Sequence, residues 1–249
     1  QLVPLGNARP PLVGSHPVRP DRLGVVNPVK PGETPRTPWI VGVSGASGTP
    51  YAAAVLRALL AAGESVDLVV SRASRLTLID ETGISFRDAH WEADLREWLS
   101  RGADGKPGTF QADIAGVRHW SAGDLAAGPS SGSYPVKGML IVPASTACVA
   151  GVALGLSKDL LQRAASVTLK ERRKLVVAVR ETPLNGQTLR HLVALDDAGA
   201  SVVPASPGFY AGATHIQDLV DFVAGRVLDA AGVEHGLYRR WKGELGHGT

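Results

Sequence analysis

Residues 39–50 read WIVGVSGASGTP, and this stretch decides the fold. An apolar run typical of a buried β-strand breaks into a turn of glycine and serine, and a helix opens directly behind it. Pro50 suits a first helical position, and the small apolar residues after it extend the predicted helix to Gly63. Such a turn leaves unpaired backbone N–H groups at the positive end of a helix, where α/β proteins often hold phosphate. Phosphate binding is one interpretation of the turn, and plain packing of strand against helix is the other.

The spacing of the glycines narrows the kind of nucleotide. They stand at positions 42, 45 and 48, which is not the G-x-G-x-x-G fingerprint of dinucleotide sites. The next predicted strand, residues 65–70, ends at Ser71, where an NAD site would place a carboxylate for the ribose. The pattern therefore favours a mononucleotide. Ser71 also suits the N-cap of a following helix, and the two roles are compatible.

Composition sets the outer limits. A chain of 249 residues can bury one α/β core, and its single cysteine, Cys148, excludes an internal disulfide and fits a reducing, cytoplasmic compartment. The net charge of +3 gives no argument for nucleic acid, and no apolar run is long enough to span a membrane. Residues 1–37 are rich in proline and arginine and poor in large apolar residues, so we expect a disordered arm. Residues 38–249 then form a single domain.

The remaining strands and helices alternate along the chain. Predicted strands at residues 138–142, 174–179 and 200–203 each run into a turn and then a helix, which indicates a doubly wound, mostly parallel sheet. A polar insert covers about residues 86–120. In such sheets ligands bind outside the carboxyl ends of the strands. Unusual turn segments fall at that edge, and we expect them to form one site: residues 45–48, 143–148, 180–181 and 207–210.

Several motifs now occur in the order found in one known family. They are residues 41–48, 130–133, 169–173 (LKERR), 179–184 (VRETPL), 207–210 (PGFY) and 225–229 (GRVLD). In these the chain resembles the flavin prenyltransferases of the UbiX/Pad type. The resemblance implies a flavodoxin-like Rossmann fold and transfer of a dimethylallyl group from dimethylallyl monophosphate to N5 and C6 of reduced FMN. It also implies trimers that assemble into dodecamers, and a UbiD-type decarboxylase that receives the prenylated FMN.

The same resemblance implies roles for individual residues. The FMN-binding positions are Gly45, Ala46, Ser47, Ser71, Ser145, Thr146, Ala147, Cys148 and Arg180. The positions around the prenyl phosphate are Arg163, Lys170, Tyr210 and Arg226, with Glu181 beside them. The catalytic positions are Ser47, Glu81 and Glu181.

Elementary chemistry makes sense of this set. Ionising an allylic phosphate without a metal requires cationic side chains to stabilise the departing phosphate, and arginine or lysine does this best in a dry pocket. The sequence has no aspartate-rich magnesium motif, in agreement with a monophosphate donor and no metal. Glu181 is the candidate acid and base, with the Ser47 hydroxyl as a relay beside N5.

The chain also departs from the family pattern, and two alternatives stay open. Ala144 and Cys148 replace residues usual in the second flavin loop, and Leu125 replaces a tryptophan that some members place before the Ser-Gly-Ser loop. One alternative is an FMN-dependent cysteine decarboxylase of the same fold, although its Pro-x-Met-Asn segment is absent. The other is a non-catalytic flavin-binding regulatory subunit.

Overall fold

The computed structural model describes residues 36–241 and 243, with the exception of residue 112. The predicted arm at residues 1–37 lies outside the described residues, apart from its last two. The centre of the molecule is a six-stranded sheet in the order β3-β2-β1-β4-β5-β6, and every pairing is parallel. The strands are β1 (Trp39–Val43), β2 (Val66–Val70), β3 (Val117–Ser121), β4 (Gly138–Ala144), β5 (Lys174–Val179) and β6 (Ser201–Pro204). The predicted doubly wound parallel sheet is confirmed.

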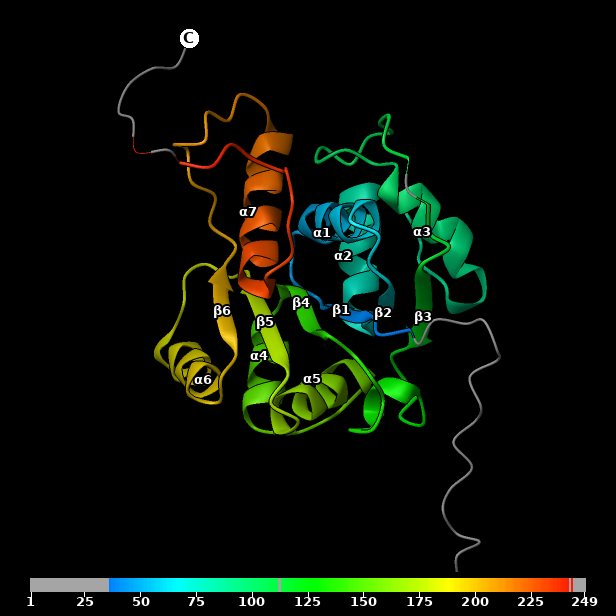
Figure 1. The fold of residues 1–249 in the computed structure, drawn as a ribbon, viewed down its shortest axis with the longest axis vertical. Coiled ribbons are helices and arrows are strands. Elements are labelled where there is room, and N and C mark those ends of the chain that lie inside the picture. Colours follow the sequence, from blue (N-terminus) through cyan, green and yellow to red (C-terminus); the bar gives the residue numbers. More distant parts are fainter. Residues whose placement is uncertain (1–35, 112, 242, 244–249) are drawn as a thin grey trace, which may run out of the picture. The chain divides into compact units, whose positions relative to one another are not determined.

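Helices cover both faces of this sheet (Figure 1). One layer packs α1 against α7, α2 and α3, and the other packs α4 against α5 and α6. The first layer comprises α1 (Thr49–Ala61), α2 (Arg72–Thr82), α3 (Trp91–Leu99) and α7 (Ile216–Ala231). The second comprises α4 (Thr146–Ala153), α5 (Leu160–Lys170) and α6 (Gly186–Asp197). Two short 3₁₀ turns, η2 (Asp88–His90) and η3 (Gly128–Ser130), lie in the connections before α3 and after β3.

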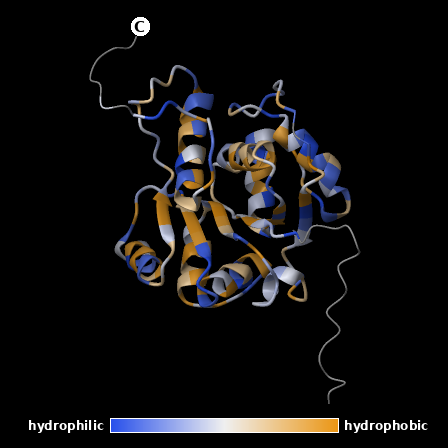
Figure 2. Ribbon diagram, viewed as in Figure 1, coloured by the Kyte–Doolittle hydropathy of each residue, from blue (hydrophilic) through white to orange (hydrophobic). Residues whose placement is uncertain are grey.

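Alternation of side chains along β1 explains the two cores. Val41 and Val43 belong to the cluster under α1 and α7, whereas Ile40 belongs to the cluster under α5. Successive side chains of a strand point to opposite faces, so a strand covered on both faces must be apolar throughout. All five residues of β1 are buried, and the central strands are hydrophobic along their length (Figure 2).

The strand that sequence analysis missed is β3. Its residues, VRHWS, pair in register with β2 at the edge of the sheet, and only Val117 among them is fully buried. A polar edge strand carries no continuous apolar run, so its sequence resembles a loop. Most of β3 therefore belongs to the stretch at residues 86–120 that we interpreted as an insert. The same stretch forms α3, in which Leu95 and Trp98 are buried.

Along the described part of the chain, none of the helices combines the length and the apolar character that crossing a membrane requires.

Candidate functional site

One buried hydroxyl joins the loops that follow β1 and β4. Ser44 Oγ donates to the Pro143 carbonyl at 2.8 Å and accepts from the Ser145 backbone N–H at 2.7 Å. These two strands are neighbours at the point where the strand order reverses, which is the usual ligand crevice of a doubly wound sheet. The Ser44 bond thus holds together the predicted FMN-binding segments, Gly45–Ser47 and Ser145–Cys148. Nothing in the sequence pattern singled out Ser44 from the other hydroxyls of the turn.

Two of the predicted site serines are helix caps. The Ser71 hydroxyl accepts from the Ser74 backbone N–H at 3.1 Å at the start of α2. The Ser145 hydroxyl accepts from the Cys148 N–H at 3.3 Å at the start of α4. Each cap satisfies one orphan donor of its helix and fixes the loop before it. Both helices consequently begin at the carboxyl edge of the sheet with their N-termini facing the crevice.

The expectation of unpaired N–H groups at the start of α1 is wrong, and Glu81 is the reason. Its carboxylate accepts from the Gly48 and Thr49 N–H groups, both at 2.8 Å, and from the Thr49 hydroxyl at 2.6 Å. A negative carboxylate is a natural partner for the positive end of a helix, and here it occupies two N–H groups that a phosphate would otherwise use. The Glu81 side chain, predicted as catalytic, therefore caps α1 from the last turn of α2.

Arg180 connects the loop after β5 with the loop after β1. Its Nε donates to the Ser47 carbonyl at 2.9 Å, and its backbone N–H donates to the Ala144 carbonyl at 3.1 Å. The Ser47 hydroxyl itself makes no hydrogen bond within the described residues and lies at the surface. Glu181 is exposed, with its carboxylate accepting from the Thr182 N–H at 2.9 Å. The structure thus brings together the predicted residues Ser47, Arg180 and Glu181 at one edge of the sheet.

A cavity of about 490 Å³ opens beside these residues. Its polar lining includes Ser47, Glu81 and Arg180, and Leu219 and Val220 of α7 contribute an apolar wall. Further lining residues are Gly48, Pro50, Tyr51, Ala103, Asp104, Pro207 and Ile216. The cavity can therefore take a ligand with one polar side and one apolar side.

Tyr51 and Asp104 were missed as site residues. Burial raises the pKa of the Tyr51 phenol; the positive charge of Arg180 acts in the opposite direction, and Glu81 adds to the increase. Its position directly after Pro50 in the first turn of α1 is the signal that could have revealed it. Asp104 belongs to the stretch interpreted as an insert, and no local pattern connects that stretch with the edge of the sheet.

A second, cationic cavity of about 430 Å³ lies at the β2 and β3 side of the same edge. Arg72 and Arg75 of α2 line it together with Lys158, and Asp88 and Asp159 contribute negative charge. Leu125, the residue that replaces a tryptophan, lines this cavity as well. Because positive side chains lie at a helix N-terminus here, this cavity is better suited to binding an anion than the cavity beside Ser47 and Arg180.

Cys148 is buried and lines neither of these two cavities. Its thiol belongs to the core cluster under α4 and α5, and burial raises its pKa to about 12. A thiol of this kind stays protonated near neutral pH and packs as a small apolar side chain, which argues against a nucleophilic role. Cys148 contributes its backbone N–H to the second flavin loop by donating to the Ser145 hydroxyl, and its role in binding FMN stays a prediction.

Arg163 and Lys170 form a separate group on α5. Arg163 Nε donates to the Ser130 carbonyl at 3.2 Å, and Lys170 pairs with Glu171 beside Gly132. Lys170 ends α5 shortly before the first residue of β5, whereas Arg180 follows the last. The six residues of β5 span roughly 20 Å. Within one protomer, Lys170 therefore lies near the opposite edge of the sheet from Arg180.

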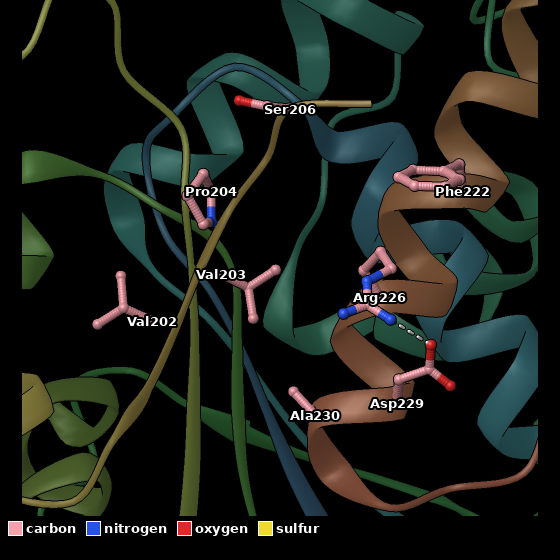
Figure 3. Close-up of a pocket in the computed structure, with 8 residues that line it drawn as sticks. All are labelled: Val202, Val203, Pro204, Ser206, Phe222, Arg226, Asp229 and Ala230. Carbon is pink, nitrogen blue, oxygen red and sulfur yellow. Dashed lines mark hydrogen bonds and ion pairs between the residues drawn. The ribbon is translucent and has the colours of Figure 1, made fainter. Parts of the chain in front are cut away.

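Tyr210 and Arg226 lie together at the outer side of β6 and α7. The Tyr210 ring packs edge-on against Phe222, with ring centroids 5.4 Å apart. Arg226 lines a cavity of about 470 Å³ between the end of β6 and α7, with Asp229 bonded to its guanidinium (Figure 3). The predicted phosphate residues thus fall into two groups: Arg163 and Lys170 on α5, and Arg226 on α7 with Tyr210 in the loop before it. Within the described residues no cluster of three or more histidine, cysteine or acidic side chains could hold a metal.

Comparison with known proteins identifies the family. The family model described as Flavoprotein matches residues 29–228. The flavin prenyltransferase UbiX of Streptomyces coelicolor is 92% identical over 209 residues, which cover 84% of this chain and 97% of that protein. The flavin prenyltransferase UbiX of Synechocystis is 41% identical over 84% of this chain and 97% of its own length.

Solved structures agree with the sequences. The structure of AnUbiX (PadA1) in complex with FMN and dimethylallyl pyrophosphate superposes with a TM-score of 0.70 and 33% identity, over 84% of this chain and 99% of that one. A dodecameric FMN-dependent UbiX-like decarboxylase from Escherichia coli O157:H7 gives a TM-score of 0.70 and 35% identity, over 83% and 100%. These matches confirm the flavodoxin-like fold and favour prenyl transfer over both alternatives. The chain belongs to the flavoprotein family and, within it, to the UbiX flavin prenyltransferases.

Proposed function

We propose that this chain transfers a dimethylallyl group from a dimethylallyl phosphate ester to N5 and C6 of reduced FMN. Two neighbouring features support the proposal: a cationic cavity at Arg72 and Lys158, and a half-apolar cavity at Ser47 and Arg180, both at the carboxyl edge of the sheet. A flavin mononucleotide has the matching parts, an anionic phosphate and a flat ring with one polar edge. The residues present therefore fit FMN, and its reduced ring supplies the nucleophilic atoms of the reaction.

Different residues at the carboxyl edge of the sheet bind the phosphate and the ring of FMN. Arg72 and Lys158 neutralise the phosphate, with Arg75 beside them in an ion pair with Asp88, and the N-terminus of α2 behind Ser71 adds its positive end. Ser47 and Arg180 face the ring, since the Ser47 hydroxyl is free within the described residues and Arg180 holds the Ser47 backbone in place. Residues 145–147 contribute the second loop, fixed through Ser44.

The prenyl donor requires an apolar wall and cationic partners. Leu219 and Val220 give the five-carbon chain its wall, and they exclude water from the allylic cation. Tyr210 and Arg226 bind the phosphate and stabilise it as it leaves. Glu181 is exposed beside Arg180, so its carboxylate is free to accept a proton from the ring and return one to the phosphate. Glu81 acts by holding the turn at Ser47 in place.

A second copy of this chain completes the phosphate shell. Arg163 and Lys170 lie on α5, and no contact within the described residues joins them to Tyr210 or Arg226. We therefore propose a homo-oligomer built from trimers, in which α5 of one protomer faces α7 of the next. The UbiX-like relative from Escherichia coli is dodecameric, which is consistent with such an assembly. Mixing Lys170→Ala with Arg226→Ala protein tests this, because hybrid sites with both wild-type residues regain activity. A monomeric wild type with full activity contradicts it.

One incubation tests the enzyme proposal. Purified protein with reduced FMN and dimethylallyl monophosphate, in one arm, or diphosphate, in the other, is followed by mass spectrometry of the released flavin. The expected product is a flavin heavier by a five-carbon unit in the monophosphate arm, and Glu181→Gln slows its formation while FMN stays bound. No heavier flavin in either arm refutes the proposal.

Transfer to a UbiD-type decarboxylase completes the proposed role, in the cytoplasm. The resemblance to the UbiX/Pad type is what supports this partner, because it implies that a UbiD-type decarboxylase receives the prenylated FMN. Adding the reaction mixture to a UbiD-type apoenzyme should start decarboxylation. A mixture that leaves the apoenzyme inactive, although prenylated flavin is present, contradicts this part.

A further inference from the structure

The Asp229 carboxylate on α7 binds Arg226 and also residues near the end of the described chain. Its Oδ2 accepts from Arg226 Nη1 at 2.9 Å and from the Tyr238 hydroxyl at 2.5 Å. Its Oδ1 accepts from Arg240 Nη2 at 2.7 Å and lies 3.1 Å from His235 Nε2. One carboxylate on α7 thus has four partners, three of which come from residues 233–241, here called the C-terminal strap.

The environment of Asp229 keeps it charged. Its side chain is only 16% exposed. Burial alone would raise its pKa, but hydrogen bonds from Tyr238, Arg240 and His235 outweigh burial and bring the pKa to about 2. The carboxylate is therefore ionised at any pH near neutrality. Asp229 forms ion pairs with both Arg226 and Arg240, so the cluster of these three side chains carries one net positive charge.

Gly225 provides an independent sign that the strap belongs against α7. A Cβ at this position would lie 2.5 Å from Tyr238 Cε1 and 2.7 Å from His235 Cε1, closer than real side chains approach. Glycine in the middle of a helix costs about 1 kcal/mol relative to alanine, so its presence beside Arg226 calls for a reason. Here the reason is close packing of the strap on the helix backbone.

The strap also contacts the other predicted phosphate residue. Tyr238 packs against Phe222 with ring centroids 5.0 Å apart, and Phe222 packs in turn against Tyr210 at 5.4 Å. Trp241 reaches the Tyr210 ring from the end of the strap at 6.2 Å. Tyr210 and Arg226, which are 16 positions apart in sequence, are thereby held by one packed group.

We propose that Asp229 is a positioning residue, which, with the C-terminal strap over it, fixes Arg226 and Tyr210 to receive the phosphate of the prenyl donor. The inference rests on the proposed function. Within the described residues only Nη1 of Arg226 is bonded, so Nη2 and Nε remain for a ligand. The guanidinium lines the cavity with its Asp229 bond already made (Figure 3). Fixing a long side chain before binding removes an entropy loss that the ligand would otherwise cause.

A double-mutant cycle on the FMN-loaded protein tests the proposal. The measurement is the dissociation constant of dimethylallyl monophosphate with oxidised FMN, which requires no turnover. Asp229→Asn should weaken this binding about tenfold in the wild-type background and less than twofold beside Arg226→Gln, since Asp229 acts through Arg226. An equal effect in both backgrounds overturns the proposal. So does unchanged donor binding in Asp229→Asn, whatever happens to the melting temperature.

Milder and matched variants keep the test decisive if Asp229→Asn fails to fold. Tyr238→Phe removes one donor from the carboxylate and should weaken donor binding about threefold, with FMN affinity unchanged. Arg240→Gln should behave in the same way. Its neighbour Arg239, which makes no polar contact within the described residues, provides the control, and Arg239→Gln should bind as the wild type. Equal losses in Arg239→Gln and Arg240→Gln contradict the proposal. Failure of the proposed function shows separately, as wild-type protein that forms no five-carbon adduct.

Discussion

Replacement of Glu81 by alanine tests the finding that this carboxylate caps α1. The change removes three hydrogen bonds of 2.6 to 2.8 Å, two of them from the first backbone N–H groups of the helix. Loss of a helix cap costs up to about 2 kcal/mol, and loss of a charge at the helix dipole adds up to about 1 kcal/mol. We therefore expect the free energy of unfolding to fall by about 2–3 kcal/mol. For a domain of this size that lowers the melting temperature by roughly 4–12 °C.

Thermal unfolding followed by circular dichroism measures this shift, and Asp80 provides the control. Asp80 precedes Glu81, is exposed and makes no polar contact within the described residues, so Asp80→Ala should melt with the wild type. Glu81→Gln keeps one acceptor oxygen and should lose about half as much as alanine. If Glu81→Ala melts within 2 °C of Asp80→Ala, the capping argument is wrong. A Glu81→Gln enzyme that melts normally but has lost turnover would instead return Glu81 to the catalytic group.

Three further outcomes follow from the geometry. Cys148 should resist iodoacetamide in the native protein at pH 8 and react after unfolding. Because its pKa is raised from 9.0 to about 12, its contribution to stability is complete below pH 9 and is lost as the pH rises toward 12. Comparing the melting temperatures of the wild type and Cys148→Ala across this pH range measures the loss. The stability contributed by Asp229 depends on pH in the opposite direction. Its pKa falls from 3.8 to about 2, so its stabilisation is present above pH 3.8 and disappears between pH 3.8 and pH 2. If urea titrations show that Asp229→Asn loses as much stability at acid pH as the wild type, this reasoning is wrong. Arg180→Ala should weaken FMN binding at least tenfold in a flavin fluorescence titration, since it frees the Ser47 backbone; Arg190→Ala on exposed α6 should not.

Local pattern was enough to predict most of the fold. The strand and helix on either side of the turn at residues 44–48 follow from an apolar run, a glycine turn and Pro50, and each of these acts within a few residues. The helix expected after the strand at residues 200–203 is α7, whose buried residues include Phe222, Val223, Val227 and Leu228. The strand β3 could not be found in this way, because an edge strand exposes one side and needs few apolar residues.

The site was less accessible to prediction, since its bonds connect residues far apart in sequence. Glu81 reaches Gly48 across 33 positions, and Arg180 reaches Ser47 across 133. A motif indicates that such residues are present, but their partners depend on how α2 and β5 dock. The strap around Asp229 is the extreme case, because its tyrosine, arginine and histidine match no motif and acquire their role only when they pack on α7.

The single hydroxyl of Ser44 has a consequence for engineering this scaffold. Since one oxygen both donates to Pro143 and accepts from Ser145, neither loop can be redesigned alone. A graft that moves the backbone after β4 by even one ångström breaks the bond and leaves a buried polar atom unpaired under the first turn. Exchanging both loops together with Ser44, as one cassette from a relative, is the route that preserves the bond.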